Sequence, residues 1–237
     1  MTDGRREELA ASLAAMEDRI AAACAAAGRA RDEVRLLGVT KTFPASDAAL
    51  LVDLGLENLA ENRDQEAGPK AEEVPGARWH MVGSLQRNKA RSVVRWAAEV
   101  QSVDSARLAD ALGRATGSAR EAGERADPLD VLIQVSLDGD PARGGTPISE
   151  VAALADHITH VGELRLRGVM AVAPREEEPG RAFALLAQVS EQLREDHPNA
   201  AEVSAGMSHD LEQAITHGST CVRVGTALLG GRGLASP

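Results

Sequence analysis

Tyrosine is absent from this 237-residue chain, and aromatic residues make up only 2% of it. Cysteine is almost as scarce, because Cys24 and Cys221 are the only two and lack the spacing of a metal site. We therefore expect ordinary thiols and a cytoplasmic protein without disulfides. The apolar stretch from Ile20 to Ala27 is far shorter than a membrane span, and the charged N-terminus is unlike a targeting peptide.

Basic residues are fewer than acidic ones, 26 against 36, so the formal net charge is −10. This balance argues against a surface for nucleic acid or for an anionic membrane. A small anionic ligand remains compatible with it, because backbone amides and one or two arginines can create a local positive pocket.

Lysine is the rarer of the two basic residues: among 26, only Lys41, Lys70 and Lys89 are lysines. A lysine that persists where arginine has replaced the others suggests an amine that can lose its proton and attack a carbonyl.

Apolar runs alternate with amphipathic, helix-like stretches along the whole chain, a pattern typical of parallel strands joined by helical crossovers. Strands are predicted at 34–40, 57–61, 78–82, 99–103, 130–136, 164–172, 201–204 and 220–224. Helices are predicted at 5–27, 46–54, 63–73, 87–98, 105–121, 148–157, 181–195 and 208–217. Two loop-like insertions, at 138–147 and 174–180, follow the fifth and sixth strands.

Eight strand–helix units predict an α/β fold, a single (β/α)8 TIM barrel domain covering residues 1–237. We place an extra N-terminal helix at about 5–28, ended by Gly28, and the barrel at about 34–232. The alternative is a doubly wound open sheet, but no G-x-G-x-x-G follows the first strand.

Lys41 directly follows the apolar run 36–40, and Pro44 lies shortly after it. The carboxyl ends of parallel strands are where α/β folds place their active sites. We therefore expect Lys41 to be a partly buried, nucleophilic amine at the barrel mouth. The alternative is a solvated lysine at the end of a strand.

Two glycine-containing turns follow the seventh and eighth predicted strands, at 204–208 and 223–226. Gly206 and Gly225 let a ligand approach the backbone, and three hydroxyl side chains accompany them: Ser204, Ser208 and Thr226. In barrels these loops often bind phosphate at a helix N-terminus. Ordinary turns and helix caps would give the same pattern.

A lysine at one strand end and a phosphate site at two others suggest pyridoxal 5′-phosphate (PLP) as the cofactor. Lys41 would hold it as a Schiff base, and Arg223 would reach the pyridine nitrogen. An arginine there disfavours ring protonation, so it would restrain carbanion chemistry. Asn62 and His80 stand in two further polar clusters at strand ends, although a histidine beside Trp79 is more typical of a core residue.

Several motifs, in this order, resemble those of the pyridoxal phosphate homeostasis proteins. They are Leu37-Gly38-Val39-Thr40-Lys41-Thr42, Glu61-Asn62, the block Trp79 to Lys89, Leu166 to Met170, Ser204 to Ser208, and Gly218 to Ala227. The resemblance runs from about residue 5 to 232.

The resemblance implies PLP fold type III, a barrel like the N-terminal domain of alanine racemase, with PLP on Lys41. It also implies phosphate contacts near Ser208, Gly225 and Thr226, and ring contacts from Asn62, Met207 and Arg223. The full set of expected cofactor contacts is Lys41, Asn62, His80, Ser204, Met207, Ser208, Arg223, Gly225 and Thr226. No metal ligand is predicted.

Three functions are weighed. Family members look like carriers or regulators of PLP supply, so the first is a non-catalytic, monomeric homeostasis protein that passes PLP to apo enzymes. The second is an alanine-racemase-like amino-acid racemase with weak activity. Such racemases take a tyrosine from a second domain as their second acid/base, and this chain has no tyrosine. The third is a barrel for another phosphorylated metabolite, with Lys41 as a point charge, in which binding would partly survive Lys41→Arg.

Overall fold

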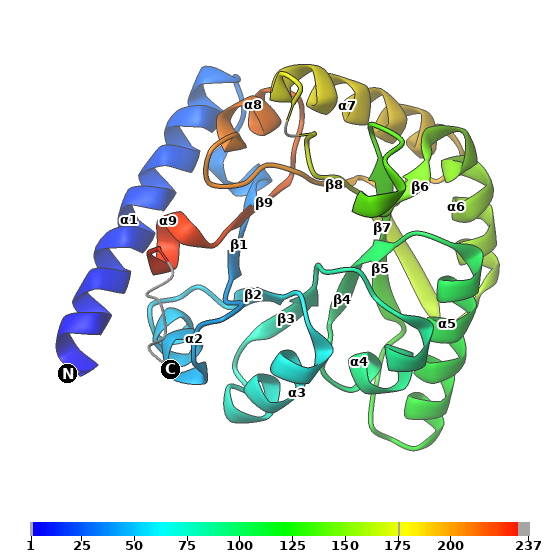
Figure 1. The fold of residues 1–237 in the computed structure, drawn as a ribbon, viewed down its shortest axis with the longest axis horizontal. Helices are drawn as coiled ribbons and strands as arrows, with labels where there is room; N and C mark the ends of the chain where they lie inside the picture. Colours follow the sequence, from blue (N-terminus) through cyan, green and yellow to red (C-terminus); the bar gives the residue numbers. More distant parts are fainter. Residues whose placement is uncertain (1, 175, 232–237) are drawn as a thin grey trace.

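The computed structural model describes residues 2–174 and 176–231, in which strands and helices alternate (Figure 1). The strands are β1 (Arg35–Val39), β2 (Asn58–Glu61), β3 (Arg78–Met81), β4 (Glu99–Val103), β5 (Leu129–Ser136), β6 (Thr146–Pro147), β7 (Leu164–Met170), β8 (Glu202–Ser204) and β9 (Cys221–Val224). The helices are α1 (Thr2–Ala26), α2 (Ala45–Asp53), α3 (Asp64–Glu73), α4 (Ala90–Trp96), α5 (Ala106–Glu121), α6 (Val151–His160), α7 (Pro179–Asp196), α8 (Leu211–Thr216) and α9 (Thr226–Leu229). Short 3₁₀ turns occupy Arg31–Glu33, Arg87–Lys89, Pro141–Arg143 and Ile148–Glu150.

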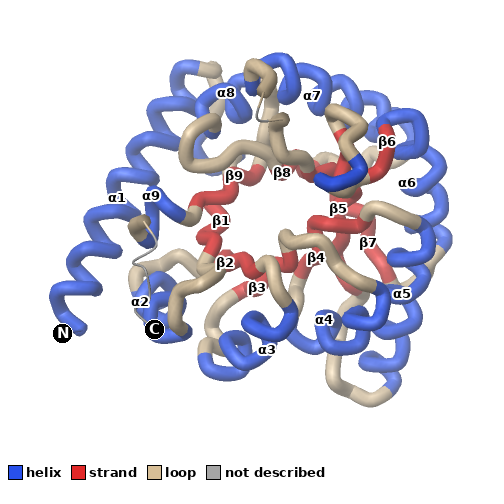
Figure 2. Tube along the Cα trace, in the orientation of Figure 1, coloured by secondary structure: helices blue, strands red, loops and turns tan. Residues whose placement is uncertain are grey.

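The strands form one parallel sheet in the order β4-β3-β2-β1-β9-β8-β7-β5-β6, and a further pairing of β4 with β5 closes it. Only the two-residue β6 lies outside the ring, so the described part of the chain forms a barrel of eight strands. Figure 2 shows this ring with the helices around it. The predicted (β/α)8 barrel is confirmed, and the doubly wound alternative is wrong because the sheet closes on itself.

The hydrophobic core lies mainly between the strands and the surrounding helices. Leu36 and Leu59 point outward into a cluster that includes the buried face of α1, while Val131 and Ile133 belong to a second cluster under α4 to α7. A third, small cluster is formed by Leu37, Ala60 and Cys221, with Val39 and Val82 packed against it. The strands also bury polar and charged side chains, among them His80, Glu99, Gln101 and Arg223.

Helix α1 lies outside the ring against α8 and α9 (Figure 1). It buries Leu9, Met16 and Ile20 on one side. Gly28, with φ of +68°, follows its end, and Arg29 N–H donates to the Cys24 carbonyl at 2.9 Å. The predicted N-terminal helix and its glycine stop are therefore confirmed.

The first insertion contacts the segment that leads from β7 into the second insertion. Arg143 pairs with Asp138 at 3.1 Å in the first insertion, and its Nη2 donates to the carbonyls of Val172 and Ala173 at 2.8 and 2.9 Å. Arg175 of the second insertion, and residue 232 at the predicted end of the barrel, lie outside the described residues.

Across 2–174 and 176–231, no helix combines the length and apolar character needed to cross a bilayer. The same residues contain no group of three or more His, Cys, Asp or Glu placed to hold a metal ion.

Candidate functional site

Lys41 follows β1 at the carboxyl end of the barrel, as predicted, but its side chain is exposed rather than partly buried. It lies in a tight turn in which the Phe43 N–H donates to the Thr40 carbonyl at 3.0 Å. Thr42, the residue after the lysine, has φ of +70°. A β-branched residue is seldom found with positive φ, so the backbone beside Lys41 is strained.

The two glycine-containing turns after β8 and β9 lie side by side. The Ser208 hydroxyl accepts a hydrogen bond from the Ala227 N–H at 3.4 Å, which joins the first turn to the start of α9. A Cβ added at Gly206, where φ is +92°, would lie 2.7 Å from the Ala214 Cβ. Glycine is thus required there for both conformation and packing.

Backbone amides at these turns are available to a ligand. Within the described residues, no acceptor is bonded to the N–H of Ser208, Gly225 or Thr226. Gly225 is the N-cap of α9 and provides no capping side chain. The donor set therefore fits an anion such as a phosphate group.

Arg223 extends from β9 into the interior of the barrel and is 6% exposed. Its Nη1 donates to the Ser204 carbonyl and hydroxyl, both at 2.7 Å, and its Nη2 donates to the Ala171 carbonyl at 2.8 Å. Burial lowers the pKa of Arg223. Three of its five N–H donors are used in this way, and within the described residues the Nε–H and the second Nη2–H are left for a ligand atom.

Ser204 was expected to contact the cofactor, and its hydroxyl is instead engaged within the protein. Besides accepting from Arg223, it donates to Gln101 Oε1 at 2.7 Å. The side chain is fully buried. Ser204 therefore holds the Arg223 guanidinium in place.

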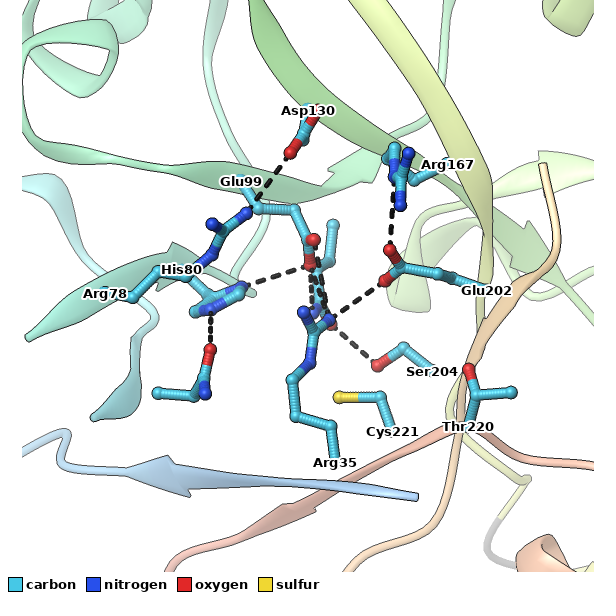
Figure 3. A network of polar contacts seen from close by, with 12 residues as sticks. Arg35, Arg78, His80, Glu99, Asp130, Arg167, Glu202, Ser204, Thr220 and Cys221 are labelled. Carbon is cyan, nitrogen blue, oxygen red and sulfur yellow. Dashed lines mark hydrogen bonds and ion pairs between the residues drawn. The ribbon is translucent and has the colours of Figure 1, made fainter. Parts of the chain in front are cut away.

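His80 lies inside the barrel, in a charged network near the amino ends of the strands (Figure 3). Its Nδ1 lies 3.1 Å from Glu99 Oε1 and its Nε2 lies 3.1 Å from Asn58 Oδ1. Burial lowers the pKa of His80. Both ring nitrogens are engaged, so this geometry gives His80 no nitrogen for a hydrogen bond to a cofactor.

Glu99 and Arg35 are at the centre of that network. Arg35 Nη2 lies 3.3 Å from Glu99 Oε1 and 3.0 Å from Glu202 Oε2. Burial acts to raise the pKa of Glu99, but the hydrogen bond with His80 and the charge of Arg35 outweigh it and lower the pKa to about 2. This network was not predicted, because its members come from strands that meet only when the barrel closes.

Asn62 and Met207 are both half-buried, beyond the ends of β2 and β8. The Met207 N–H donates to Asp210 Oδ1 at 2.5 Å, which fixes the backbone of the turn. No hydrogen bond to the Asn62 side chain is found within the described residues. Both residues retain some exposed surface beyond the strand ends.

Lys70 and Glu61 stand out in the sequence, but their pairing with each other next to the Lys41 turn was not predicted. Lys70 is 8% exposed and Glu61 is fully buried. A signal was present: Asp64, Ala67 and Lys70 recur at helical spacing on the buried face of α3, and Lys70 is one of only three lysines.

Comparison with known families places this site in context. Residues 11–233 match the family model described as alanine racemase, N-terminal domain. The pyridoxal phosphate homeostasis protein of Mycobacterium tuberculosis is 47% identical over 248 residues, which cover 98% of this chain and 96% of the relative. That of Escherichia coli is 36% identical over 233 residues, 95% of this chain and 97% of the relative.

Solved structures give the same picture. PipY of Synechococcus elongatus with PLP bound matches with a TM-score of 0.80 and 31% identity, over 94% of this chain and all of PipY. Alanine racemase of Clostridium difficile matches with a TM-score of 0.74 and 15% identity, over 97% of this chain and 58% of the racemase. The second likeness concerns the fold alone.

Proposed function

This chain belongs to the family of the pyridoxal phosphate homeostasis proteins, and from that premise we propose that it binds PLP on Lys41 and acts in PLP homeostasis. One observation supports the proposal above all others: the exposed Lys41 follows β1, and the adjacent strand β9 provides both Arg223 and the free amides of Gly225 and Thr226. A primary amine and an anion site at the ends of neighbouring strands match the two ends of PLP.

The residues present fit the cofactor. The amides of Ser208, Gly225 and Thr226 would hold the phosphate, and Asn62 and Met207 would flank the ring. The free Nε of Arg223 would face the pyridine nitrogen. When bound, PLP supplies an aldehyde that condenses with a primary amine and a ring that withdraws electrons. His80 and Ser204 are assigned to the support of this site rather than to contact.

Arg223 determines how far that chemistry goes. A guanidinium donates a hydrogen bond and stays protonated, so it keeps a facing pyridine nitrogen free of its own proton. The ring is then a weaker electron sink. The chain also lacks tyrosine, the second acid/base of the racemases that share this fold. We therefore propose a monomeric, cytoplasmic carrier or regulator that supplies apo PLP enzymes, with at most slow racemase activity.

The test compares the visible absorbance of the wild type, Lys41→Ala, Lys41→Arg and a matched control, Lys89→Arg, after incubation with a series of PLP concentrations and removal of the unbound PLP. We expect the wild type and Lys89→Arg to become yellow and to bleach with borohydride. Lys41→Ala and Lys41→Arg should do neither, because neither side chain forms an imine.

Two outcomes would contradict the proposal. A wild type that takes up no PLP would favour a barrel for another phosphorylated metabolite. An unchanged absorbance titration in Lys41→Arg would place the covalent bond on another amine.

A further inference from the structure

A buried polar cluster lies directly under the turn that carries Lys41. Lys70 Nζ, from α3, donates to the Thr40 carbonyl at 2.9 Å and to Glu61 Oε1 at 2.6 Å. The Thr40 hydroxyl donates to the same Glu61 oxygen at 2.7 Å. Thr40 and Glu61 are fully buried and Lys70 is 8% exposed. The three side chains therefore bond to one another beneath the protein surface.

The Thr40 carbonyl is the point at which this cluster meets the lysine turn. It accepts hydrogen bonds from Lys70 and from the Phe43 N–H, the bond that closes the turn around Lys41 and Thr42. Thr42 has φ of +70°, a conformation that favours glycine over threonine. The turn is thus unfavourable in its own sequence, and an outside contact is needed to hold it.

Lysine suits this position in a way that arginine does not. Its compact ammonium has three donors that can point in separate directions, whereas the guanidinium is a larger, planar fork. Here one ammonium reaches a carbonyl just after β1 and a carboxylate at the end of β2. Glu61 Oε2 has no hydrogen-bond partner within the described residues, so Lys70 is the only charge that compensates this buried carboxylate.

We propose that Lys70 is a positioning residue for Lys41: its ammonium, paired with Glu61, fixes the Thr40 carbonyl and with it the turn that presents Lys41. The part that concerns PLP rests on the proposed function above. Glu61 is also the last residue of β2 and directly precedes Asn62. The same cluster therefore sets the Lys41 turn and the Asn62 backbone relative to each other.

The experiment uses Lys70→Met combined with Glu61→Gln. This pair removes both charges at similar volume, so no uncompensated carboxylate stays buried. Lys70→Arg keeps the charge and changes only the geometry. Lys89→Met is the matched control, because Lys89 pairs with Asp64 at 3.9 Å and has no contact with the turn. Circular dichroism and thermal melting establish that each variant is folded.

Two readouts are measured on each variant: hydrogen exchange of the Phe43 amide by NMR, and the rate at which added PLP is trapped on Lys41 by borohydride. In the double variant and in Lys70→Arg, we expect the Phe43 amide to exchange about tenfold faster and PLP to be trapped about tenfold more slowly. A change of this size corresponds to the loss of a charge-assisted hydrogen bond. Lys89→Met should match the wild type in both.

The outcomes separate this inference from the proposed function. Wild-type Phe43 exchange in the double variant and in Lys70→Arg would overturn the positioning role, whatever happens with PLP. Faster exchange with unchanged trapping would show that the turn is held by Lys70 without consequence for Lys41, and would also overturn it. A wild type that traps no PLP on Lys41 contradicts the proposed function, and the Phe43 exchange then decides on Lys70 alone.

Discussion

Gly83 packs against the backbone of Asn62, so closely that an added Cβ would lie 2.2 Å from the Asn62 carbonyl oxygen. The obstructing atoms belong to the main chain and cannot move aside like the tip of a side chain. This contact sets the position of Asn62 at the mouth, since the segment after β3 has to touch the segment after β2.

For this reason we expect Gly83→Ala to lower the free energy of unfolding by about 1–3 kcal/mol, as for overpacked sites, and to weaken PLP binding. Urea denaturation and an absorbance titration measure the two effects. Gly162→Ala is the control, because no atom lies within 4 Å of its added Cβ. It should stay within about 0.5 kcal/mol of the wild type. Equal stability of the two variants would contradict the packing argument.

Individual site residues were predictable to different degrees. Lys41 was identified from the scarcity of lysine and its place after an apolar run, both of which are local in the sequence. The exposure of its side chain was not predicted, because burial depends on which other segments cover the barrel mouth. Lys70 and Glu61 meet only when α3 folds back onto β2, so their pairing cannot be read from spacing.

At the level of elements, α5 contains two glycines in very different surroundings. A Cβ added at Gly113 would lie 2.2 Å from Val161 Cγ1, a short side chain that cannot withdraw. A Cβ added at Gly117 would lie 3.5 Å from Glu163 Cγ, an ordinary contact. One helix thus offers the same substitution with opposite expected results.

We expect Gly117→Ala to raise the free energy of unfolding by about 0.5–1 kcal/mol, because alanine is the better helix former. Gly113→Ala should lower it by about 1–3 kcal/mol through overpacking. Chemical denaturation of both variants beside the wild type measures the difference. Stabilisation by Gly113→Ala would show that α5 is free to move away from Val161.

All the strands that close the barrel were predicted to within about two residues. Apolar residues dominate β1 and β5, a pattern typical of buried strands. Strand β6 was not predicted: two residues in a polar insertion give no period to detect. Helix α6 begins after a 3₁₀ turn at Ile148–Glu150, a distinction that depends on hydrogen bonds rather than on residue type.

On the scale of the whole molecule, the network of Arg35, His80, Glu99 and Glu202 links strands from across the barrel (Figure 3). The lowered pKa of Glu99, about 2, means that the folded state favours its ionised form more than the unfolded state does. The contribution of Glu99 to the free energy of unfolding is present above about pH 4.5 and is lost as the pH falls towards 2. His80, whose pKa is also lowered, acts in the same direction from about pH 6.5 downward.

Acid should therefore destabilise the wild type more steeply than Glu99→Gln. Protonation of Glu99 should lower the free energy of unfolding of the wild type by about 3 kcal/mol between pH 4.5 and 2. At neutral pH the variant should be the less stable protein. Urea denaturation at a series of pH values gives both curves. Parallel curves for the two proteins would show that Glu99 titrates alike in the folded and unfolded states.

The central claim is that Lys41 is the amine that holds PLP, and peptide mapping after borohydride reduction of the PLP-loaded protein tests it most directly. We expect the pyridoxyl group on the peptide that contains Lys41, and none on the peptides that contain Lys70 and Lys89. A pyridoxyl group on another peptide, or a protein that carries none after loading, would contradict it.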